Sequence, residues 1–382
     1  MGKSIELYIH IPFCVKKCKY CDFLSMPAEE YIQDMYIRQL IEEITVQSTF
    51  YTDYVVSTIF FGGGTPSILK SVHITNIMSA IYAHWKVEAN AEISLEANPG
   101  TLSQERLMNY RTAGINRLSI GLQSSNNSEL KVLGRIHTFE DFLESYEAAR
   151  NAGFDNINID LISGIPGQTL TSWKNTVKRT AMLKPEHISA YSLIIEEGTE
   201  FHDLYSSKEG KKLLPDEDTD REMYHETAKI LSTYGYGRYE ISNYAREGCE
   251  CRHNIGYWTG AEYLGLGLGA SSYTMGRRFH VENDLNNYLH IDMQKDITPL
   301  YEDIQELTDR DKITEFMILG LRMTKGVSSA EFVERFGRNM MDMFYYEFDK
   351  HVRHGLIEIV PPYVRLTEKG LDLANVVMED FV

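Results

Sequence analysis

Three cysteines near the start of the sequence, Cys14, Cys18 and Cys21, have the spacing C-x3-C-x2-C. A loop of this length can wrap all three thiolates around one metal centre, and thiolates suit iron–sulfur clusters or zinc. A structural zinc site needs a fourth close ligand, and the adjacent Asp22 and Phe23 supply no thiol or imidazole. Three ligands leave one iron of a cubane cluster open to a small molecule. The spacing therefore favours an iron–sulfur cluster over zinc or unliganded thiols.

Further polar residues and glycines stand at or just after the ends of strand-like segments. They are His10, the turn Gly62–Pro66, Glu96, Gln123 and Asp160. In parallel α/β folds the carboxyl ends of the strands form the edge at which ligands bind. Ordinary turns would account for the glycines but not for the two carboxylates and the amide. The pattern therefore predicts a ligand site on the same edge as the cysteine loop.

Strand-like and amphipathic helical segments alternate through the first half of the sequence. The strand candidates are 6–11, 55–61, 91–97, 117–122, 156–162 and 187–193. The helix candidates between them are 28–47, 72–85, 103–112, 139–151 and 172–182. Repeated β-then-α units imply right-handed crossovers and a parallel sheet. Because six units fall short of the full eightfold barrel, we expect an α/β fold with a partial (β/α)6 TIM-like barrel, in preference to an open doubly wound sheet.

The alternation ends after residue 193. A helix over 216–234 and a glycine-rich segment at 263–270 follow, and from about residue 303 the pattern is purely helical until 355–367. The pattern of that last segment predicts a short hairpin. A hairpin that follows several helices is typical of a winged-helix-like module. Its charge is not strongly basic, which favours a packing or lid role over DNA binding. We expect two domains, 1–300 and 301–382.

The charge balance limits the classes of partner. The 382 residues include 38 basic and 55 acidic side chains, a formal net charge of −17. This charge repels polyphosphate backbones and anionic membrane surfaces, so we expect no nucleic-acid partner. No apolar run reaches the roughly 20 residues that span a bilayer. No export signal precedes the first strand-like segment, so we expect a cytoplasmic protein.

Several segments together resemble one protein family. The C-x3-C-x2-C loop followed by the turn Gly62–Pro66 resembles the radical S-adenosylmethionine (SAM) superfamily. The string Tyr8–Cys14 narrows the resemblance to the branch that contains the oxygen-independent coproporphyrinogen III dehydrogenases (HemN) and the heme chaperones (HemW). Residues 316–322 and 366–370 look like the carboxyl-terminal module of that branch. The resemblance implies a barrel of the radical SAM type.

The resemblance also implies a set of cofactor-binding residues. Cys14, Cys18 and Cys21 would ligate a [4Fe-4S] cluster whose open iron chelates SAM. Glycine lacks the Cβ that would keep the backbone away from a ligand, and an arginine can bind a carboxylate with two hydrogen bonds. The implied SAM contacts are the turn residues Gly63, Gly64 and Thr65, the polar residues Glu96, Gln123, Arg135 and Asp160, and the aromatic residues Tyr8 and Tyr20.

A second motif lies at 253–258. Its residues are His253, Asn254, Tyr257 and Trp258, which match the HNxxYW motif associated with heme in HemW-like proteins. A neutral imidazole can ligate heme iron, and aromatic rings offer flat apolar surface to a porphyrin. The resemblance therefore implies heme contact, with His253 as the candidate axial ligand. Cys249 and Cys251 lack the C-x-x-C-H spacing of covalent heme attachment, and we interpret them as free loop cysteines in preference to a second metal site or a heme contact.

Two functions follow from the resemblance. The first is a heme chaperone that binds heme and hands it to an acceptor protein, with a [4Fe-4S] cluster, SAM and heme as cofactors. Its expected partners are heme, an acceptor for which respiratory proteins are candidates, and an electron donor of the flavodoxin type. The alternative is an oxygen-independent coproporphyrinogen III dehydrogenase, but that enzyme has a further cysteine where this chain has Phe23, and a longer segment before Tyr8. These departures favour the chaperone and leave enzymatic activity open, with no catalytic residue assigned. An RNA-modifying radical SAM enzyme is disfavoured by the net charge.

Overall fold

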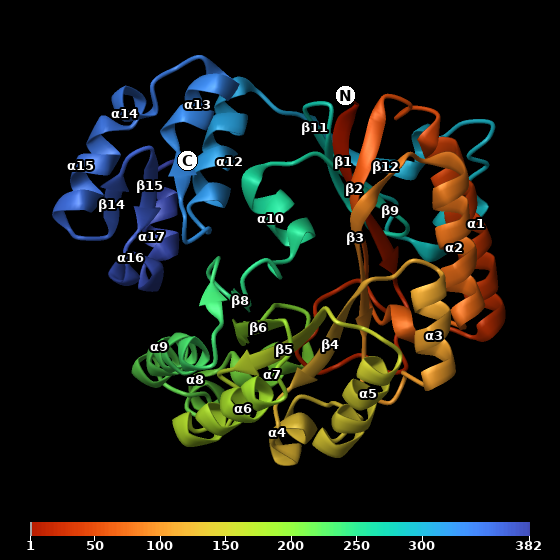
Figure 1. Cartoon of the computed structure of the whole chain (residues 1–382), viewed down its shortest axis with the longest axis horizontal. Coiled ribbons are helices and arrows are strands. Elements are labelled where there is room, and N and C mark those ends of the chain that lie inside the picture. The colour runs from red at the N-terminus through yellow and green to blue at the C-terminus, as the bar shows by residue number, and fades with distance from the viewer. Residues whose placement is uncertain (1) are drawn as a thin grey trace.

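The computed structural model describes residues 2–382 as a curved α/β sheet flanked by helices, with a separate carboxyl-terminal module (Figure 1). Six parallel strands form the main part of the sheet: β1 (Lys3–Ile11), β2 (Tyr54–Gly63), β3 (Val87–Ala97), β4 (Arg117–Gln123), β5 (Ile157–Ser163) and β6 (His187–Ser192). They pair side by side in chain order. Each strand coincides with a predicted segment to within a few residues at its ends. The predicted partial barrel is therefore confirmed.

Helices follow the strands and cover the outer face of the sheet. The five predicted ones are α1 (Glu30–Ser48), α2 (Ser71–His84), α3 (Gln104–Thr112), α5 (Phe139–Asn151) and α6 (Leu170–Met182). The barrel part of the chain also contains α9 (Glu217–Thr233), which was predicted too, and the short helices α4 (Asn127–Val132), α7 (Glu200–Tyr205), α8 (Lys208–Lys211), α10 (Arg252–Thr259) and α11 (Leu285–His290), of which α10 lies beside the barrel interior. Among residues 2–382, no helix has the length and apolar character needed to cross a membrane.

The sheet continues beyond the six parallel strands at both ends. At one end β9 (Tyr263–Leu266) lies parallel to β1, and β10 (Ser271–Thr274), β11 (Arg277–Val281) and β12 (Tyr301–Glu306) follow in antiparallel pairing. At the other end β8 (Asn243–Ala245) and β7 (Gly237–Arg238) pair after β6. The two end strands are not paired with each other, so the barrel is open. The expectation of helix alone from about residue 303 to 355 is wrong for 303–306, because β12 pairs there with β11, and for 327–328, where a short strand pairs with 363–364.

The two faces of the strands differ in chemistry. On β1, Ile5, Leu7 and Ile9 are fully buried in the core beneath the helices. The alternate residues Glu6 and Tyr8 point to the other face, where Tyr8 lines a cavity inside the barrel. Barrels of this kind usually fill their interior with branched aliphatic side chains. This interior is instead polar, which is expected of a barrel that holds ligands inside.

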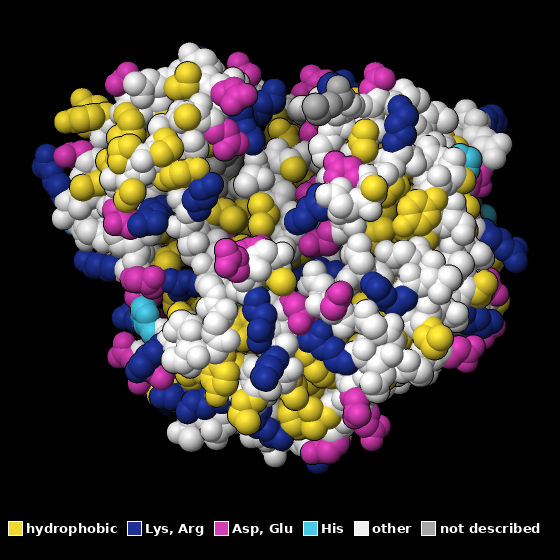
Figure 2. Space-filling view, in the orientation of Figure 1, with side chains coloured by type: hydrophobic (Ala, Val, Ile, Leu, Met, Phe, Trp, Pro, Cys, Tyr) yellow, Lys and Arg dark blue, Asp and Glu magenta, His cyan; other side chains and the backbone are white. Residues whose placement is uncertain are grey.

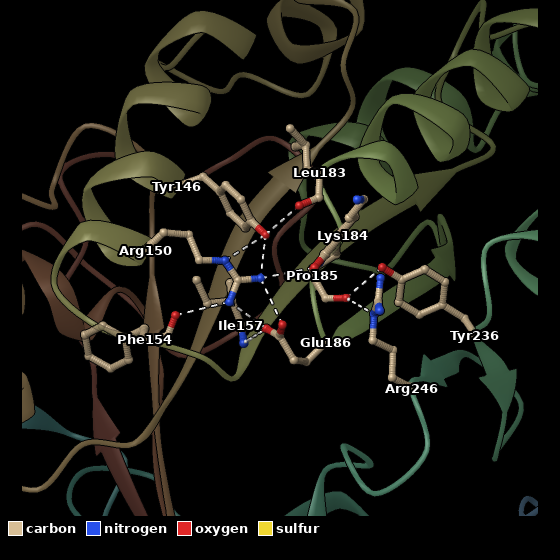
Figure 3. Close-up of polar contacts among 10 residues, drawn as sticks. All are labelled: Tyr146, Arg150, Phe154, Ile157, Leu183, Lys184, Pro185, Glu186, Tyr236 and Arg246. Carbon is tan, nitrogen blue, oxygen red and sulfur yellow. Dashed lines mark hydrogen bonds and ion pairs between the residues drawn. The ribbon is translucent and has the colours of Figure 1, made fainter.

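A hydrogen-bonded cluster at the starts of β5 and β6 fixes the chain that leads to α10 (Figure 3). Arg150 of α5 pairs with Glu186 at 2.8 Å, and Glu186 also accepts from the backbone amide of Ile157 at 3.0 Å. Tyr236 and Arg246 both donate to the carbonyl of Pro185, at 2.6 and 3.1 Å. The segment after β8 is thus tied to the base of the barrel just before it enters α10.

The carboxyl-terminal module has its own hydrophobic core, which begins at Ile313. It consists of α12 (Asp309–Gly320), α13 (Ser329–Phe336), α14 (Met340–Met343), α15 (Tyr345–Arg353), α16 (Glu368–Asp372) and α17 (Ala374–Glu379), with β13 (Val327–Ser328), β14 (Ile357–Val360) and β15 (Tyr363–Leu366). The antiparallel hairpin β14–β15 agrees with the predicted winged-helix-like arrangement. Because β12 belongs to the barrel sheet, we propose a domain division after Glu306 in place of 300/301.

Charges of both signs are distributed over the face of the molecule drawn in Figure 2. Figure 2 shows Lys and Arg side chains intermixed with Asp and Glu on the visible face, across the barrel and the module. The excess of acidic groups in the sequence is therefore not separated into one acidic and one basic surface on this side.

Candidate functional site

A cavity of about 410 Å³ lies at the carboxyl ends of the parallel strands. Its walls include most of the residues that the sequence predicted for the cluster and for SAM. These are Cys14, Cys18, Cys21, Tyr20, Gly63, Gly64, Thr65, Glu96, Gln123, Arg135 and Asp160. They come from the cysteine loop, from the carboxyl-terminal parts of β2, β3, β4 and β5 and, for Arg135, from the loop after α4, so the topology brings together segments far apart in the sequence.

The cysteine loop leaves the end of β1 and is closed at its base by backbone pairing. The amide of Cys14 donates to the carbonyl of Met26 at 3.0 Å, and the amide of Cys21 donates to the carbonyl of Cys18 at 3.2 Å. All three thiols are free and half-buried, and burial raises the pKa of Cys21. Among residues 2–382, no group of three or more His, Cys, Asp or Glu side chains is arranged to hold a single metal ion. Three thiols on one loop facing the cavity fit the ligand set of an iron–sulfur cluster with one open iron.

The glycine turn after β2 packs directly against the start of the cysteine loop. Gly63 has a φ of 106°, which favours glycine. A Cβ on Gly64 would lie 2.6 Å from the carbonyl oxygen of Phe13. The next residue, Thr65, donates its amide to that same carbonyl at 2.8 Å, and its Oγ1 lies 3.3 Å from Sγ of Cys14. The turn therefore positions the cysteine loop as well as lining the cavity.

Two carboxyl groups, Glu96 on β3 and Asp160 on β5, face the cavity. Burial and, to a lesser extent, the charge of Asp160 raise the pKa of Glu96 to about 8, against the opposing hydrogen bond from Gly63. Burial also raises the pKa of Asp160, although Ser119 and Asn158 each donate to it at 2.8 Å. At neutral pH Glu96 is mainly protonated. It would have to lose that proton to accept from a ligand's ammonium group as a carboxylate.

Arg135 reaches the cavity from the loop after α4. Its Nη1 donates toward Sγ of Cys18 at 3.5 Å, and its Nη2 donates to the carbonyl of Gly121 at 2.9 Å and to Oδ1 of Asn98 at 2.5 Å. A Cβ on Gly121 would lie 3.0 Å from Nη2, so the glycine keeps the space for the guanidinium. The only cation among the predicted SAM contacts therefore lies beside a cysteine of the loop.

Asn98 is a site residue that sequence reasoning missed. It donates to Oγ1 of Thr65 at 2.8 Å while it accepts from Arg135, so it joins the glycine turn to the arginine. The available signal was its position directly after β3, two residues beyond Glu96. Gln123, which was predicted, has a φ of 69°. Such a conformation is uncommon for a residue other than glycine and is concentrated at functional sites.

A second cavity, of about 160 Å³, lies deeper in the barrel. Tyr8, predicted as a SAM contact, lines this inner cavity and not the larger one. Three residues of the HNxxYW motif also line it, namely His253, Asn254 and Tyr257. Glu96, Ser119, Asp160 and Tyr191 belong to the walls of both cavities. The structure thus places most of the second motif next to the predicted SAM site.

The fourth motif residue, Trp258, points elsewhere. Its indole lies under the guanidinium of Arg322, 4.3 Å from the ring centroid. Arg322 follows α12 in the carboxyl-terminal module and lies 3.8 Å from the buried carboxylate of Glu240. Helix α10 therefore lies between the barrel and the module, as Figure 1 shows, and Trp258 contacts the module side.

The imidazole of His253 is buried, with 1% of its surface exposed. Its Nδ1 lies 2.7 Å from Oγ1 of Thr58 and its Nε2 lies 2.9 Å from the hydroxyl of Tyr257. The ring also stacks on Phe60, with centroids 5.1 Å apart. Burial and, secondly, the charge of Arg117 lower the pKa of His253 to about 3. The ring is therefore neutral, and both of its nitrogens already have hydrogen-bond partners.

Two acidic residues that sequence reasoning missed hold α10 in the barrel. Glu92 of β3 accepts from the first two amides of the helix, those of Arg252 at 3.1 Å and His253 at 3.2 Å. A carboxylate is favourable at that helix end. Glu6 of β1 packs against Gly256, where a Cβ would lie 2.0 Å from its Oε1. Burial raises the pKa of Glu6 to about 9.

Cys249 and Cys251 are both free thiols. Cys251 is fully buried at the start of α10, and its Sγ lies 3.5 Å from Oε1 of Glu92. Burial raises the pKa of both thiols, that of Cys251 to about 12. The geometry gives Cys251 a place in the support of α10.

Comparison with known proteins places the chain among characterised relatives. The radical SAM superfamily model matches residues 8–180, and the HemN C-terminal domain model matches residues 307–373. The heme chaperone HemW of Bacillus subtilis (strain 168) is 37% identical over 378 residues, which are 98% of each chain. The heme chaperone HemW of Escherichia coli (strain K12) is 33% identical over 387 residues, covering 99% of this chain and 98% of the relative.

One solved structure is similar over the whole chain. It is coproporphyrinogen III oxidase (HemN) from Escherichia coli, described as a radical SAM enzyme, with a TM-score of 0.85 and 25% identity. The match covers 100% of this chain and 90% of that one. Barrel and module therefore both have counterparts in that enzyme.

Proposed function

Because the chain belongs to the HemW family of radical SAM proteins, we propose that it binds heme and transfers it to an acceptor protein. The observation that carries this proposal is the full-length similarity to proteins named heme chaperone HemW. The presence of the HNxxYW motif on α10, beside the inner cavity, supports it.

Radical SAM proteins carry a [4Fe-4S] cluster and SAM, and the larger cavity supplies suitable groups for both. We place the cluster on Cys14, Cys18 and Cys21, whose thiols face that cavity. When bound, the cluster would supply an electron to the sulfonium of SAM. Arg135 would hold the carboxylate of SAM, and Glu96 would accept from its ammonium group. Tyr20, Gln123, Asp160 and the glycine turn would complete the walls.

Heme contact is assigned to the α10 motif. His253, Asn254 and Tyr257 line the inner cavity, while Trp258 lies toward the module. His253 can ligate iron only through a ring nitrogen, and each nitrogen has a partner, Thr58 or Tyr257. Ligation by His253 therefore requires one of these two hydrogen bonds to break, and it also requires the inner cavity to open, because a volume of about 160 Å³ does not hold a porphyrin ring.

Anaerobic heme titration followed by transfer tests the proposed function. The reconstituted protein is titrated with heme while the Soret absorbance is recorded, and the complex is then mixed with apomyoglobin as a heme acceptor. Saturable binding and transfer faster than dissociation of heme into buffer would support the chaperone function. Absence of saturable binding would refute it.

The similarity to HemN supports a second candidate, oxygen-independent coproporphyrinogen III dehydrogenase. Against this alternative, the position two residues after Cys21 is an exposed phenylalanine, Phe23. Incubation with coproporphyrinogen III, SAM and a reductant is expected to give no protoporphyrinogen. Robust decarboxylation would replace the chaperone proposal with this one.

Protein partners are also part of the proposal. The acceptor would be a heme-binding protein, with respiratory proteins as candidates, and the electron donor would be of the flavodoxin type. Exposed Lys16 and Lys17 in the cysteine loop offer positive charge to an acidic donor. Salt should therefore slow reduction of the cluster by such a donor.

A further inference from the structure

Arg117 occupies an unusual place in the barrel. It is the first residue of β4, its side chain has 2% of its surface exposed, and it lines the inner cavity. Interior positions of such barrels normally hold branched aliphatic residues. An arginine stays charged in proteins, so the fold keeps a positive charge in the interior of the barrel.

This guanidinium has almost no partners. In the described part of the chain, its one hydrogen bond is a long contact of 3.5 Å from Nη1 to Oγ of Ser94, and its Nε has no acceptor. Within the described residues 2–382, no carboxylate lies within 4.0 Å of it, although other cationic side chains have such pairs, for example Lys19 with Glu200 and Arg365 with Glu358. A buried charge without a partner is costly. A bound anion would offset this cost by pairing with the guanidinium.

The acidic residues nearby are engaged with other groups. Glu92 accepts from the first amides of α10, and Asp160 accepts from Ser119 and Asn158. Glu96 has a pKa raised to about 8 by burial, so it carries little charge at neutral pH. None of the three forms a hydrogen bond or an ion pair with Arg117. Against the opposing effect of burial, acidic groups farther away, Cys251, Glu92 and Asp160 among them, raise the pKa of Arg117.

The size of the inner cavity limits what could meet this charge. Its volume is about 160 Å³, the share of about five water molecules in the liquid. This space holds a carboxylate on a short aliphatic arm but not a porphyrin ring. The cavity shares Glu96, Ser119, Asp160 and Tyr191 with the larger cavity, so an arm can enter from that side.

We propose that the inner cavity is a carboxylate-binding site in which Arg117 pairs with the carboxylate of a short aliphatic group. Two sources share this chemistry, a free short-chain carboxylate and a propionate arm of heme. The second source rests on the proposed function, whereas the site itself does not.

The first experiment uses propionate as the probe and propionamide as its neutral control. Binding of each to the full-length protein is followed by ligand-observed NMR. The wild type should bind propionate saturably and propionamide not at all. Arg117→Gln should weaken propionate binding by tenfold or more, as expected when a charged hydrogen-bond donor is lost, and Arg117→Lys should fall between them. Equal binding of the two probes, or an unchanged affinity in Arg117→Gln, would overturn the proposal.

A matched control is Arg238→Gln. Arg238 is also mostly buried, with 8% of its side chain exposed, but it is paired with Glu368 at 2.7 Å. This variant should keep the wild-type affinity for propionate. Thermal unfolding without ligand adds a test that does not require binding. Arg117→Gln should unfold at the same or a higher temperature than the wild type, because it removes an unpaired buried charge. A marked decrease would show that Arg117 is already compensated inside the protein and would overturn the proposal.

The second experiment separates the two sources by comparing heme with its dimethyl ester. If the propionate arm occupies the site, the wild type binds heme about tenfold more tightly than the ester, and Arg117→Gln removes that difference. If heme binding is insensitive to Arg117 while propionate binding is lost, the free carboxylate is the ligand and the site is upheld. If the wild type binds no heme, the proposed function fails, and the propionate experiment still decides the site.

Discussion

Nδ1 of His253 lies 2.7 Å from Oγ1 of Thr58, and this contact joins the HNxxYW helix to the second strand of the barrel. Thr58 is buried, and the other ring nitrogen of His253 is held by Tyr257 at 2.9 Å. A heme iron would therefore have to compete with a hydroxyl group for either nitrogen. A typical hydrogen bond contributes about 0.5–1.5 kcal/mol, which corresponds to about two- to tenfold in affinity.

If His253 is the axial ligand, removal of the hydroxyl group of Thr58 or of Tyr257 should therefore increase the affinity for heme. We expect Thr58→Val and Tyr257→Phe each to tighten heme binding within that range, and His253→Ala to weaken it and shift the Soret band. Heme titrations of the three variants provide the measurement. If all three match the wild type, His253 only supports α10 and the axial ligand lies elsewhere.

Glu92 should be required for the placement of α10. Its carboxylate accepts two backbone amides at the start of the helix and contacts the thiol of Cys251. In Glu92→Gln a donor replaces one acceptor, so a buried amide is left without a partner, at a cost of about 1–3 kcal/mol in the free energy of unfolding. Chemical denaturation measures this cost. Faster hydrogen exchange over residues 252–259 than in the wild type would show that the loss of stability lies in α10.

Glu88→Gln is the comparison for that variant. Glu88 contacts Arg252 at 3.5 Å with about a third of its side chain exposed, and such surface pairs contribute about 0–1 kcal/mol. If the two variants lost equal stability, α10 would not depend on the buried carboxylate.

The spacing of the motifs was sufficient to predict the parallel strands and the location of the larger cavity. Strand ends meet at one edge of a parallel sheet, so Glu96 and Asp160 could be placed together from their positions alone. The contacts of α10 could not be predicted in this way. Whether His253 faces solvent or the barrel interior depends on tertiary packing of an eight-residue helix, and its sequence pattern does not say which face is covered.

Arg117 and Glu92 escaped prediction for a related reason. Each belongs to a strand-like segment, in which the sequence pattern predicts that a single charged residue is exposed to solvent. Only a barrel with a polar interior gives such residues a buried role. The strand β12 was missed because Tyr301–Glu306 is mostly polar and half-exposed to exposed at the edge of the sheet, so the apolar alternation that marks a strand is weak.

The three loop cysteines should be necessary for the cluster, and the two cysteines before α10 should not. Replacing Cys14, Cys18 and Cys21 with Ala removes every thiol of the loop that faces the larger cavity. After anaerobic reconstitution this variant should contain no iron or acid-labile sulfide, while Cys249→Ala should keep the wild-type content. Bound zinc in the wild-type loop, or iron retained in the triple variant, would contradict the assignment.

Glu96 should make SAM binding depend on pH. Its pKa is raised to about 8 by burial and by Asp160, so below that pH a proton must leave before the carboxylate can accept from the ammonium of SAM. We expect the affinity of the cluster-loaded protein for SAM to rise up to about tenfold per pH unit as the pH increases toward 8, and then to level off. Equilibrium dialysis at a series of pH values up to and above 8 measures this affinity.

Glu96→Gln should bind SAM more weakly at pH 8 and lose the pH dependence. The same shift has a second consequence that needs no ligand. Because a glutamate in the unfolded chain has the ordinary carboxyl pKa of about 4.5, the unfolded chain releases the proton first. The Glu96 contribution therefore makes the folded state less stable as the pH rises from about 4.5 to 8. Glu96→Gln should therefore gain stability relative to the wild type over this interval. A stability difference between the two proteins that does not change with pH would show that Glu96 is ionised in the folded state.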